Sequence, residues 1–190
     1  MAIRKIIGKP SIKASYAYLI EKKRDGHEFT EEEVRNIVDS ILDDEMPDSQ
    51  MAALIMAIYF KDMAAQETAV FADEMILTGE TLDLSHITRP KVAKYSTGGV
   101  GDKTSLILAA VGAACGVVVP GMTSPDEDFV LTVEDKMSSI PRFKTKLSLD
   151  EFQKQLSTIG CAICEHDNSI SPVDEKIYNM RHMTATLSLI

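Results

Sequence analysis

The segment at residues 94–105, KYSTGGVGDKTS, constrains the fold more than any other part of this sequence. It follows the short apolar run Val92-Ala93 and precedes a charge-free apolar segment at 106–115. Three consecutive valines at 117–119 come next, and Pro120 follows them. This order predicts a strand, a glycine turn, a helix, and a second strand that stops at the proline.

The turn has the composition of an anion-binding site. Glycine lets a backbone turn tightly and approach a ligand without Cβ collisions, and three lie close together here: Gly98, Gly99 and Gly101. Backbone N–H groups in such a turn can share one concavity, and the next helix adds its positive end. Lys94 supplies a charge, and hydroxyls come from Ser96, Thr104 and Ser105. We expect a phosphate-binding turn, with a purely structural turn as the alternative.

Charge and hydropathy limit the partners. The chain has 190 residues and a formal net charge of -9, which opposes binding to nucleic acid. No apolar run is long enough to span a bilayer, and residues 1–13 lack the apolar core of a signal peptide. We therefore expect a cytoplasmic protein with no nucleic-acid or membrane partner.

The cysteines favour a reduced interior. There are three, an odd number, as is common where disulfides do not form. Cys161 and Cys164 make an isolated C-x-x-C in a short apolar run that predicts a strand. No second pair accompanies them, and the four histidines have no ligand spacing. We expect core cysteines and no metal, with metal or redox chemistry as the alternative.

Residues 1–79 are predicted to form an all-helical domain. Thr30 and Glu33 have the spacing of a capping box at the start of one helix. The helix around 52–60 is apolar on nearly all faces, which favours burial between helices or in a subunit interface. A following helix is expected to end at Gly79 as its C-cap. We expect this domain to hold the contact of a homodimer.

Residues 80–91 read as a polar linker to a partial α/β domain at 92–165. Within that domain an acidic turn at 124–128 precedes a predicted short strand at 129–133. A second capping box, Ser148 with Glu151, and Gly160 as C-cap bracket another predicted helix.

The last segment, 172–190, begins with a predicted helix from Pro172 to about Arg181. We expect this helix to return toward the helical domain. The apolar end at 184–190 carries no stop signal, so we interpret the chain as a truncated form.

Several motifs in order resemble one family, the pyrimidine-nucleoside and thymidine phosphorylases, which are relatives of anthranilate phosphoribosyltransferase. The matching pieces are KRDG at 23–26, MAALIMAIYF at 51–60, TGETLD at 78–83, STGGVGD at 96–102, SIP at 139–141, Tyr178 with Arg181, and TAT at 184–186. The resemblance implies an α/β protein overall: a small helical domain that dimerises, and an α/β domain, incomplete here, that binds phosphate.

The resemblance also implies the reaction of the family. These enzymes convert a pyrimidine nucleoside and phosphate to free base and pentose 1-phosphate, with phosphate as co-substrate and no further cofactor. By position, Lys94, Ser96, Ser105 and Thr123 resemble phosphate ligands, together with the glycine turn. Arg181 resembles the arginine that holds the pyrimidine and favours departure of the base. Gly101 resembles a potassium ligand of some members, but the Lys103 ammonium would repel potassium, so no metal is expected.

The sequence departs from the family at Tyr95, which stands at the family's histidine. A phenol titrates near pH about 10 and is a poor acid at neutral pH. The glycine-rich stretch of the family is replaced here by the acidic residues 126–128. Val133 stands where the family has its last phosphate-binding threonine. The serine and lysine that hold the base in the family would follow residue 190 and are missing from this sequence.

Three functions therefore stay open. The first is a pyrimidine-nucleoside phosphorylase, with thymidine or uridine as substrate. The second is a non-catalytic fragment or pseudoenzyme that dimerises or binds a partner, and the third is a phosphoribosyltransferase of the related class. We expect the chain alone to be inactive.

Overall fold

The computed structural model describes residues 15–94, 103–123, 133–165 and 169–186. The chain divides into two compact units, residues 1–81 with 167–190, and residues 82–166. None of the described helices is both long and apolar enough to cross a membrane.

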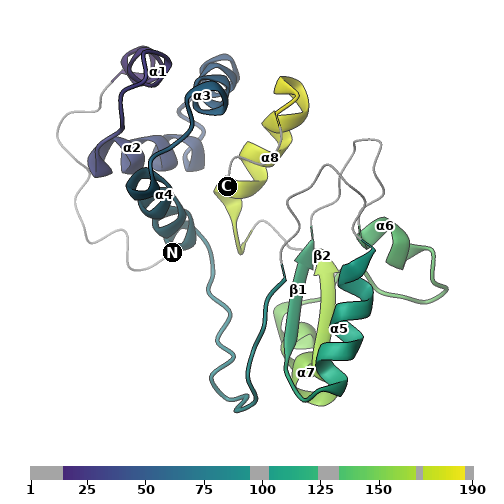
Figure 1. The fold of residues 1–190 in the computed structure, drawn as a ribbon. Coiled ribbons are helices and arrows are strands. Elements are labelled where there is room, and N and C mark those ends of the chain that lie inside the picture. Colours follow the sequence, from purple (N-terminus) through teal and green to yellow (C-terminus); the bar gives the residue numbers. More distant parts are fainter. Residues whose placement is uncertain (1–14, 95–102, 124–132, 166–168, 187–190) are drawn as a thin grey trace. The chain divides into compact units, whose positions relative to one another are not determined.

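The first unit is a bundle of five described helices (Figure 1). Their bounds are α1 Tyr16–Arg24, α2 Glu31–Leu42, α3 Asp48–Lys61, α4 Ala65–Thr78 and α8 Pro172–Thr184. All five helices contribute buried apolar side chains to one core, among them Leu19, Ile37, Leu54, Phe71 and Val173. Helix α8 is therefore part of the bundle core although more than ninety residues separate it from α4.

A lysine fixes α8 against the end of α2. Lys176 Nζ donates to the carbonyls of Ile41 and Leu42 at 3.1 and 2.9 Å and lies 2.6 Å from Asp44 Oδ1. The last carbonyls of a helix have no partner inside the helix, so a cation there is favourable.

The capping predictions in this unit are confirmed. Thr30 Oγ1 accepts from the Glu33 backbone N–H, and Glu33 Oε2 accepts from the Thr30 N–H at 2.7 Å. Gly79 is the C-cap of α4. A Cβ built on Gly79 would lie 1.7 Å from the carbonyl oxygen of Ile170, so only glycine lets these two segments lie so close.

Helix α3 is buried within its own unit over only part of its apolar surface. Leu54, Ile55 and Ile58 belong to the core, but Tyr59 and Phe60 are 46 and 72% exposed. The aromatic side chains at the C-terminal end of α3 are therefore exposed on the surface of the unit.

The second unit has helices on both faces of a two-stranded parallel sheet, over the residues that the structure describes (Figure 1). The strands are β1 Val119–Thr123 and β2 Cys161–Glu165, and the helices are α5 Thr104–Ala114, α6 Val133–Ser138 and α7 Leu149–Ile159. Phe152 and Leu156 of α7 pack with Ala162 and Cys164 of β2. On the other face Gly112 of α5 approaches β1 so closely that a Cβ would lie 2.8 Å from Val119 Cγ2.

The strand predicted at Val92-Ala93 is wrong, because only an isolated bridge joins Lys91 to Val118. Pro120 gives the reason, since it lies inside β1 instead of ending it. Val118 N donates to Pro90 O, and Val92 N donates to Val118 O. The next donor on that side of β1 would be residue 120, because alternate residues point the same way. Proline has no N–H to donate, so the segment around Lys91 pairs with the chain at Val118 through one bridge and does not continue as a strand beside β1.

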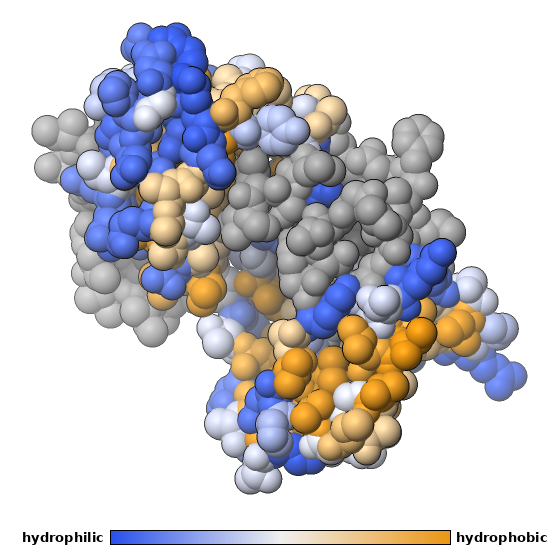
Figure 2. Space-filling model, viewed as in Figure 1, coloured by the Kyte–Doolittle hydropathy of each residue, from blue (hydrophilic) through white to orange (hydrophobic). Residues whose placement is uncertain are grey.

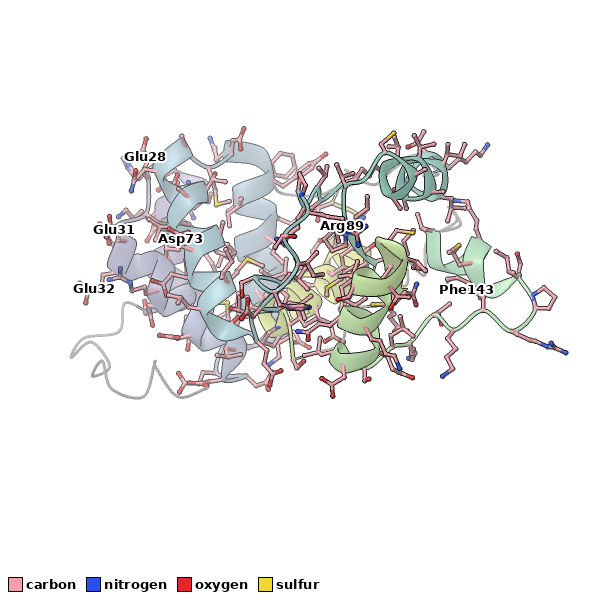
Figure 3. The ribbon with its side chains drawn as sticks, turned by 90° about the horizontal axis from the view of Figure 1, so that it is seen from below. Glu28, Glu31, Glu32, Asp73, Arg89 and Phe143 are labelled. Carbon is pink, nitrogen blue, oxygen red and sulfur yellow. The ribbon has the colours of Figure 1, made fainter. Side chains whose placement is uncertain are left out.

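Two other predictions are corrected. Val133 begins helix α6 and does not continue a strand; residues 124–132, with the acidic turn, lie outside the described residues. The polar segment after residue 81 contributes to the second unit, where Ile87 is buried and Leu82 and Leu84 pack against the core. Arg89 fixes this segment by donating from Nη2 to the carbonyl oxygens of Leu156 and Ser157 (Figure 3).

The second capping box is confirmed at α7. Ser148 Oγ accepts from the Glu151 N–H at 3.2 Å, and Glu151 Oε2 accepts from the Ser148 N–H at 3.1 Å. Gly160 ends the helix with a φ of 84°, in the left-handed region that favours glycine.

Candidate functional site

The carboxyl ends of β1 and β2 point to the same end of the second unit, and helix α5 begins there (Figure 1). In parallel α/β structures, ligands bind at this end of the strands. The first N–H groups of a helix have no intrahelical partner, and the N-cap of α5, Lys103, forms no side-chain capping bond. This end of the unit therefore has the polarity that an anion requires.

Three of the predicted phosphate ligands belong to this end. Thr123 is the last residue of β1, and Ser105 lies in the first turn of α5. Lys94 follows the bridge at Lys91, which runs parallel to β1, so the chain carries it toward the same end. All three residues are half-buried. The other predicted residues of the turn lie outside the described residues: Tyr95, Ser96, Gly98, Gly99 and Gly101.

Glu165 is a residue of this end that the sequence interpretation missed. It is the last residue of β2 and pairs with Thr123 across the sheet. Residues paired in register share a face, as do residues four apart on one strand. Val119, four residues before Thr123 on β1, packs against Gly112 of α5. Thr123 and Glu165 thus lie on the α5 face. The signal was present, because Glu165 directly follows the apolar strand at 161–164.

Lys146 compensates the charge of Glu165. Its Nζ lies 3.1 Å from Glu165 Oε2, and only 16% of the Glu165 side chain is exposed. That oxygen accepts no hydrogen bond within the described part of the chain, so the ion pair is its electrostatic partner. The Glu165 backbone N–H donates to Thr145 O at 2.8 Å, which holds the loop carrying Lys146 beside β2.

Arg181, the predicted base-binding residue, lies on α8 in the first unit. Its guanidinium carbon is 4.3 Å from the centre of the Tyr178 ring, a stacking geometry that orients the planar group. The Arg181 carbonyl accepts from the Thr186 N–H at 3.3 Å, and Ala185 has a φ of 52°. The TAT motif thus forms the C-terminal cap of the helix that carries Arg181.

The prediction about the cysteines is confirmed for one residue. Cys164 is buried in the core of the second unit, whereas Cys161 is half-buried. Among the residues that the structure describes, no group of three or more His, Cys, Asp or Glu side chains could hold a metal ion.

Comparisons with known proteins also divide the chain into a helical domain and an α/β domain, but their α/β match includes residues 167–190, which belong to the first unit of the structure. The helical bundle domain of a glycosyl transferase family matches residues 17–79, and the α/β domain of that family matches residues 88–190.

Among curated proteins, the chain is 41% identical to a pyrimidine-nucleoside phosphorylase of Geobacillus stearothermophilus over 172 residues, which is 90% of this chain and 40% of that protein. It is 40% identical to the pyrimidine-nucleoside phosphorylase of Bacillus subtilis (strain 168), with the same shares covered. Identity is 36% to a thymidine phosphorylase of Sinorhizobium medicae, where 90% of this chain and 39% of the relative are covered. The chain thus spans about 40% of the length of these relatives. With both domain models matched in order, the chain belongs to the glycosyl transferase family of the pyrimidine-nucleoside and thymidine phosphorylases.

Proposed function

We propose that this chain carries binding elements for pyrimidine-nucleoside phosphorolysis: a phosphate site at the carboxyl ends of β1 and β2, and a pyrimidine-binding group at Arg181. The observation that carries the proposal is that Ser105, in the first turn of α5, and Thr123, at the end of β1, belong to one end of the second unit. The parallel bridge at Lys91 directs the chain toward that end before Lys94, which supports its inclusion. The relatives named pyrimidine-nucleoside phosphorylase and thymidine phosphorylase support the reaction class.

The chemistry assigns one role to each element. A phosphate oxygen attacks C1′ of the pentose while the bond from C1′ to the base nitrogen breaks. The electron pair of that bond leaves with the base, which then takes up a proton. Positive charge develops on the sugar ring, and the bound phosphate dianion stabilises it while serving as nucleophile. The Arg181 guanidinium stabilises the negative charge on the departing base.

The phosphate site is tested by equilibrium dialysis with radiolabelled inorganic phosphate. We expect saturable binding of one phosphate per chain, weakened about tenfold or more in Lys94→Ala, since a charge-assisted contact to phosphate is lost. Lys154→Ala is the matched control, because Lys154 is an exposed lysine of α7. An equal loss of phosphate binding in both variants would mean that only the net charge of the chain matters, and it would contradict a phosphate site at Lys94.

Turnover by the chain alone is not part of the proposal. Each positioned donor removed from an active site commonly costs about 10²-fold in rate, and about 60% of the relatives' length has no counterpart here, given the 40% covered. We expect no phosphate-dependent release of thymine or uracil from thymidine or uridine by the purified chain. Turnover that Arg181→Ala abolishes would establish a working short enzyme.

A second candidate function is a dimerising or partner-binding module without catalysis. It is favoured by the exposed aromatic residues Tyr59 and Phe60 at the end of α3, and by Glu165, a carboxylate beside the proposed phosphate site. Normal dimerisation together with no measurable phosphate binding would select this function over the first.

A further inference from the structure

Lys146 lies at the carboxyl end of β2, outside the glycine turn that supplies most of the predicted phosphate ligands. It belongs to the connection from α6 to α7 (Figure 1). Its Nζ lies 3.1 Å from Glu165 Oε2, and Thr145, one residue earlier, accepts the Glu165 backbone N–H at 2.8 Å. These two contacts hold the Lys146 ammonium at the end of the sheet.

Lys94 and Lys146 approach the end of β1 from opposite sides. The segment that leads to Lys94 bridges to the chain at Val118, and β2 pairs with β1 from Val119 onward. Successive residues of a strand direct their backbone groups to opposite sides, so these two partners lie on either side of β1. An anion at Thr123, where β1 ends, would thus have one cation on each side.

Glu165 directs the ammonium to the face of the sheet on which α5 begins. Its side chain shares the α5 face with Thr123, and its backbone N–H is engaged at the outer edge of β2. Lys146 therefore extends from that edge toward the α5 face. Farther along α5 the surface is apolar, with Ile107 and Val111 exposed (Figure 2). The polar groups that can hold an anion therefore lie where the helix begins.

The Lys146 ammonium has donors for a second anion. It carries three N–H donors, the ion pair with one Glu165 oxygen cannot engage all of them, and 79% of the Lys146 side chain is exposed. The ammonium can therefore contact a phosphate without leaving Glu165, whose largely buried carboxylate would be costly to leave unpaired. Its charge also offsets that of Glu165, which would otherwise oppose the positive charges that Lys94 and Lys103 bring to this end.

We propose that Lys146 is a further phosphate ligand, whose ammonium bridges the Glu165 carboxylate and a phosphate bound at Thr123. Glu165 is then the positioning residue that holds this cation in place, although its own charge opposes the anion. The inference rests on the proposed phosphate site. It extends that site to the connection from α6 to α7, on the side of β1 opposite to Lys94.

The test measures the dissociation constant of radiolabelled inorganic phosphate for the full chain in the Glu165→Gln background. There the side-chain amide oxygen can still accept from Lys146, and Lys146→Ala leaves no buried carboxylate unpaired. We expect this double variant to bind phosphate about tenfold or more weakly than Glu165→Gln alone, because a charge-assisted contact is lost. Lys144→Ala in the same background is the matched control and should change nothing, since Lys144 lies on the same connection but pairs with Glu151 on α7.

A second measurement follows the lysine side-chain methylene resonances of the wild-type chain during a phosphate titration. The resonance of Lys146 should shift saturably, with the midpoint that dialysis gives, whereas that of Lys144 should not move. Lys146→Arg should keep the phosphate affinity within about threefold, because arginine retains the charge and the donors.

The failure of this inference is distinct from that of the proposed function. Equal affinity of the two double variants, with binding still weakened by Lys94→Ala, would overturn the role of Lys146 and leave the proposed phosphate site intact. Absence of saturable phosphate binding in every variant would contradict the proposed site, and Lys146 as its ligand with it.

Discussion

Thr123 and Glu165 are paired across the parallel sheet, so a predicted phosphate ligand and a carboxylate share one face at the carboxyl ends of β1 and β2. Lys146 lies 3.1 Å from that carboxylate and compensates part of its charge. Any anion bound there must be held against the field of Glu165. The balance between Glu165 and the neighbouring cations should therefore set the affinity of the proposed phosphate site.

Replacing Glu165→Gln should strengthen binding of inorganic phosphate. The substitution keeps the side-chain shape, removes one negative charge and leaves the Lys146 ammonium available to the anion. We expect an affinity gain of about threefold to tenfold at low salt, which shrinks as salt is added. Asp150→Asn is the matched control, because it changes the charge equally at an exposed position of α7. The same gain in both variants would mean that Glu165 faces away from the phosphate.

The ion pair between Lys23 and Glu67 should dominate the acid sensitivity of the first unit. Lys23 Nζ lies 2.7 Å from Glu67 Oε1, and both residues are buried. Glu67 also accepts from the backbone N–H groups of Phe29 and Ala64. Burial raises the pKa of Glu67, but the bonds from Lys23, Phe29 and Ala64 together outweigh it and lower the pKa below its ordinary value.

A carboxyl whose pKa is lowered by folding stabilises the native state above its unfolded pKa. That contribution is lost as the pH falls through the lower, folded pKa. Glu67→Gln should cost about 3–5 kcal/mol at pH 7, because it leaves Lys23 buried without a charge partner. Urea unfolding should show the difference from wild type shrinking below the ordinary pKa of a glutamate. Glu28→Gln, at an exposed position in the same unit (Figure 3), should change little.

Gly79→Ala should destabilise the first unit through a steric clash. Its φ of -109° is open to any residue, but the new Cβ would lie 1.7 Å from Ile170 O. Nearby, Glu80 N donates to Ser169 O at 2.7 Å, so the two segments cannot separate without losing this bond. We expect a cost of about 2 kcal/mol or more in urea unfolding. Gly26→Ala meets no atom within 4 Å but has a φ of 87°, and should cost about 1 kcal/mol.

The predicted homodimer should depend on Phe60. This residue is 72% exposed on α3 and contacts the Tyr59 ring edge-on at 5.5 Å between centroids. Ile58 is buried in the core, so changing it would unfold the unit instead of testing the interface. Light scattering at micromolar concentration should give twice the monomer mass, and Phe60→Lys should give the monomer. Met183→Lys is the control at another exposed apolar position. A wild-type monomer would contradict the dimer.

Local chemistry made much of the fold predictable. The capping boxes Thr30–Glu33 and Ser148–Glu151, and the left-handed Gly160, depend on residues within a few positions of one another. Family motifs then indicated which residues to propose as ligands of phosphate and of the base. The effect of Pro120 was not predictable, because it depends on which side of β1 receives the next strand.

Glu165 was missed for the same physical reason. Its importance comes from its register with Thr123, and register belongs to the folded sheet, not to either segment alone. Lys146 was missed with it, since the ion pair joins a loop to the end of a strand nineteen positions later in the chain, from 146 to 165. Contacts between segments distant in sequence thus account for the part of the site that motifs did not predict.

The most direct test of the central claim is to titrate the isotope-labelled chain with inorganic phosphate and follow its backbone amide resonances. We predict saturable shifts at Thr104, Ser105 and Thr123, where α5 begins and β1 ends, and none at Lys154 on α7. The shifts should be weaker in Lys94→Ala and should saturate at lower phosphate in Glu165→Gln. The absence of shifts at α5 and β1, or non-saturating shifts spread over exposed lysines such as Lys154, would contradict a phosphate site at the carboxyl ends of these strands.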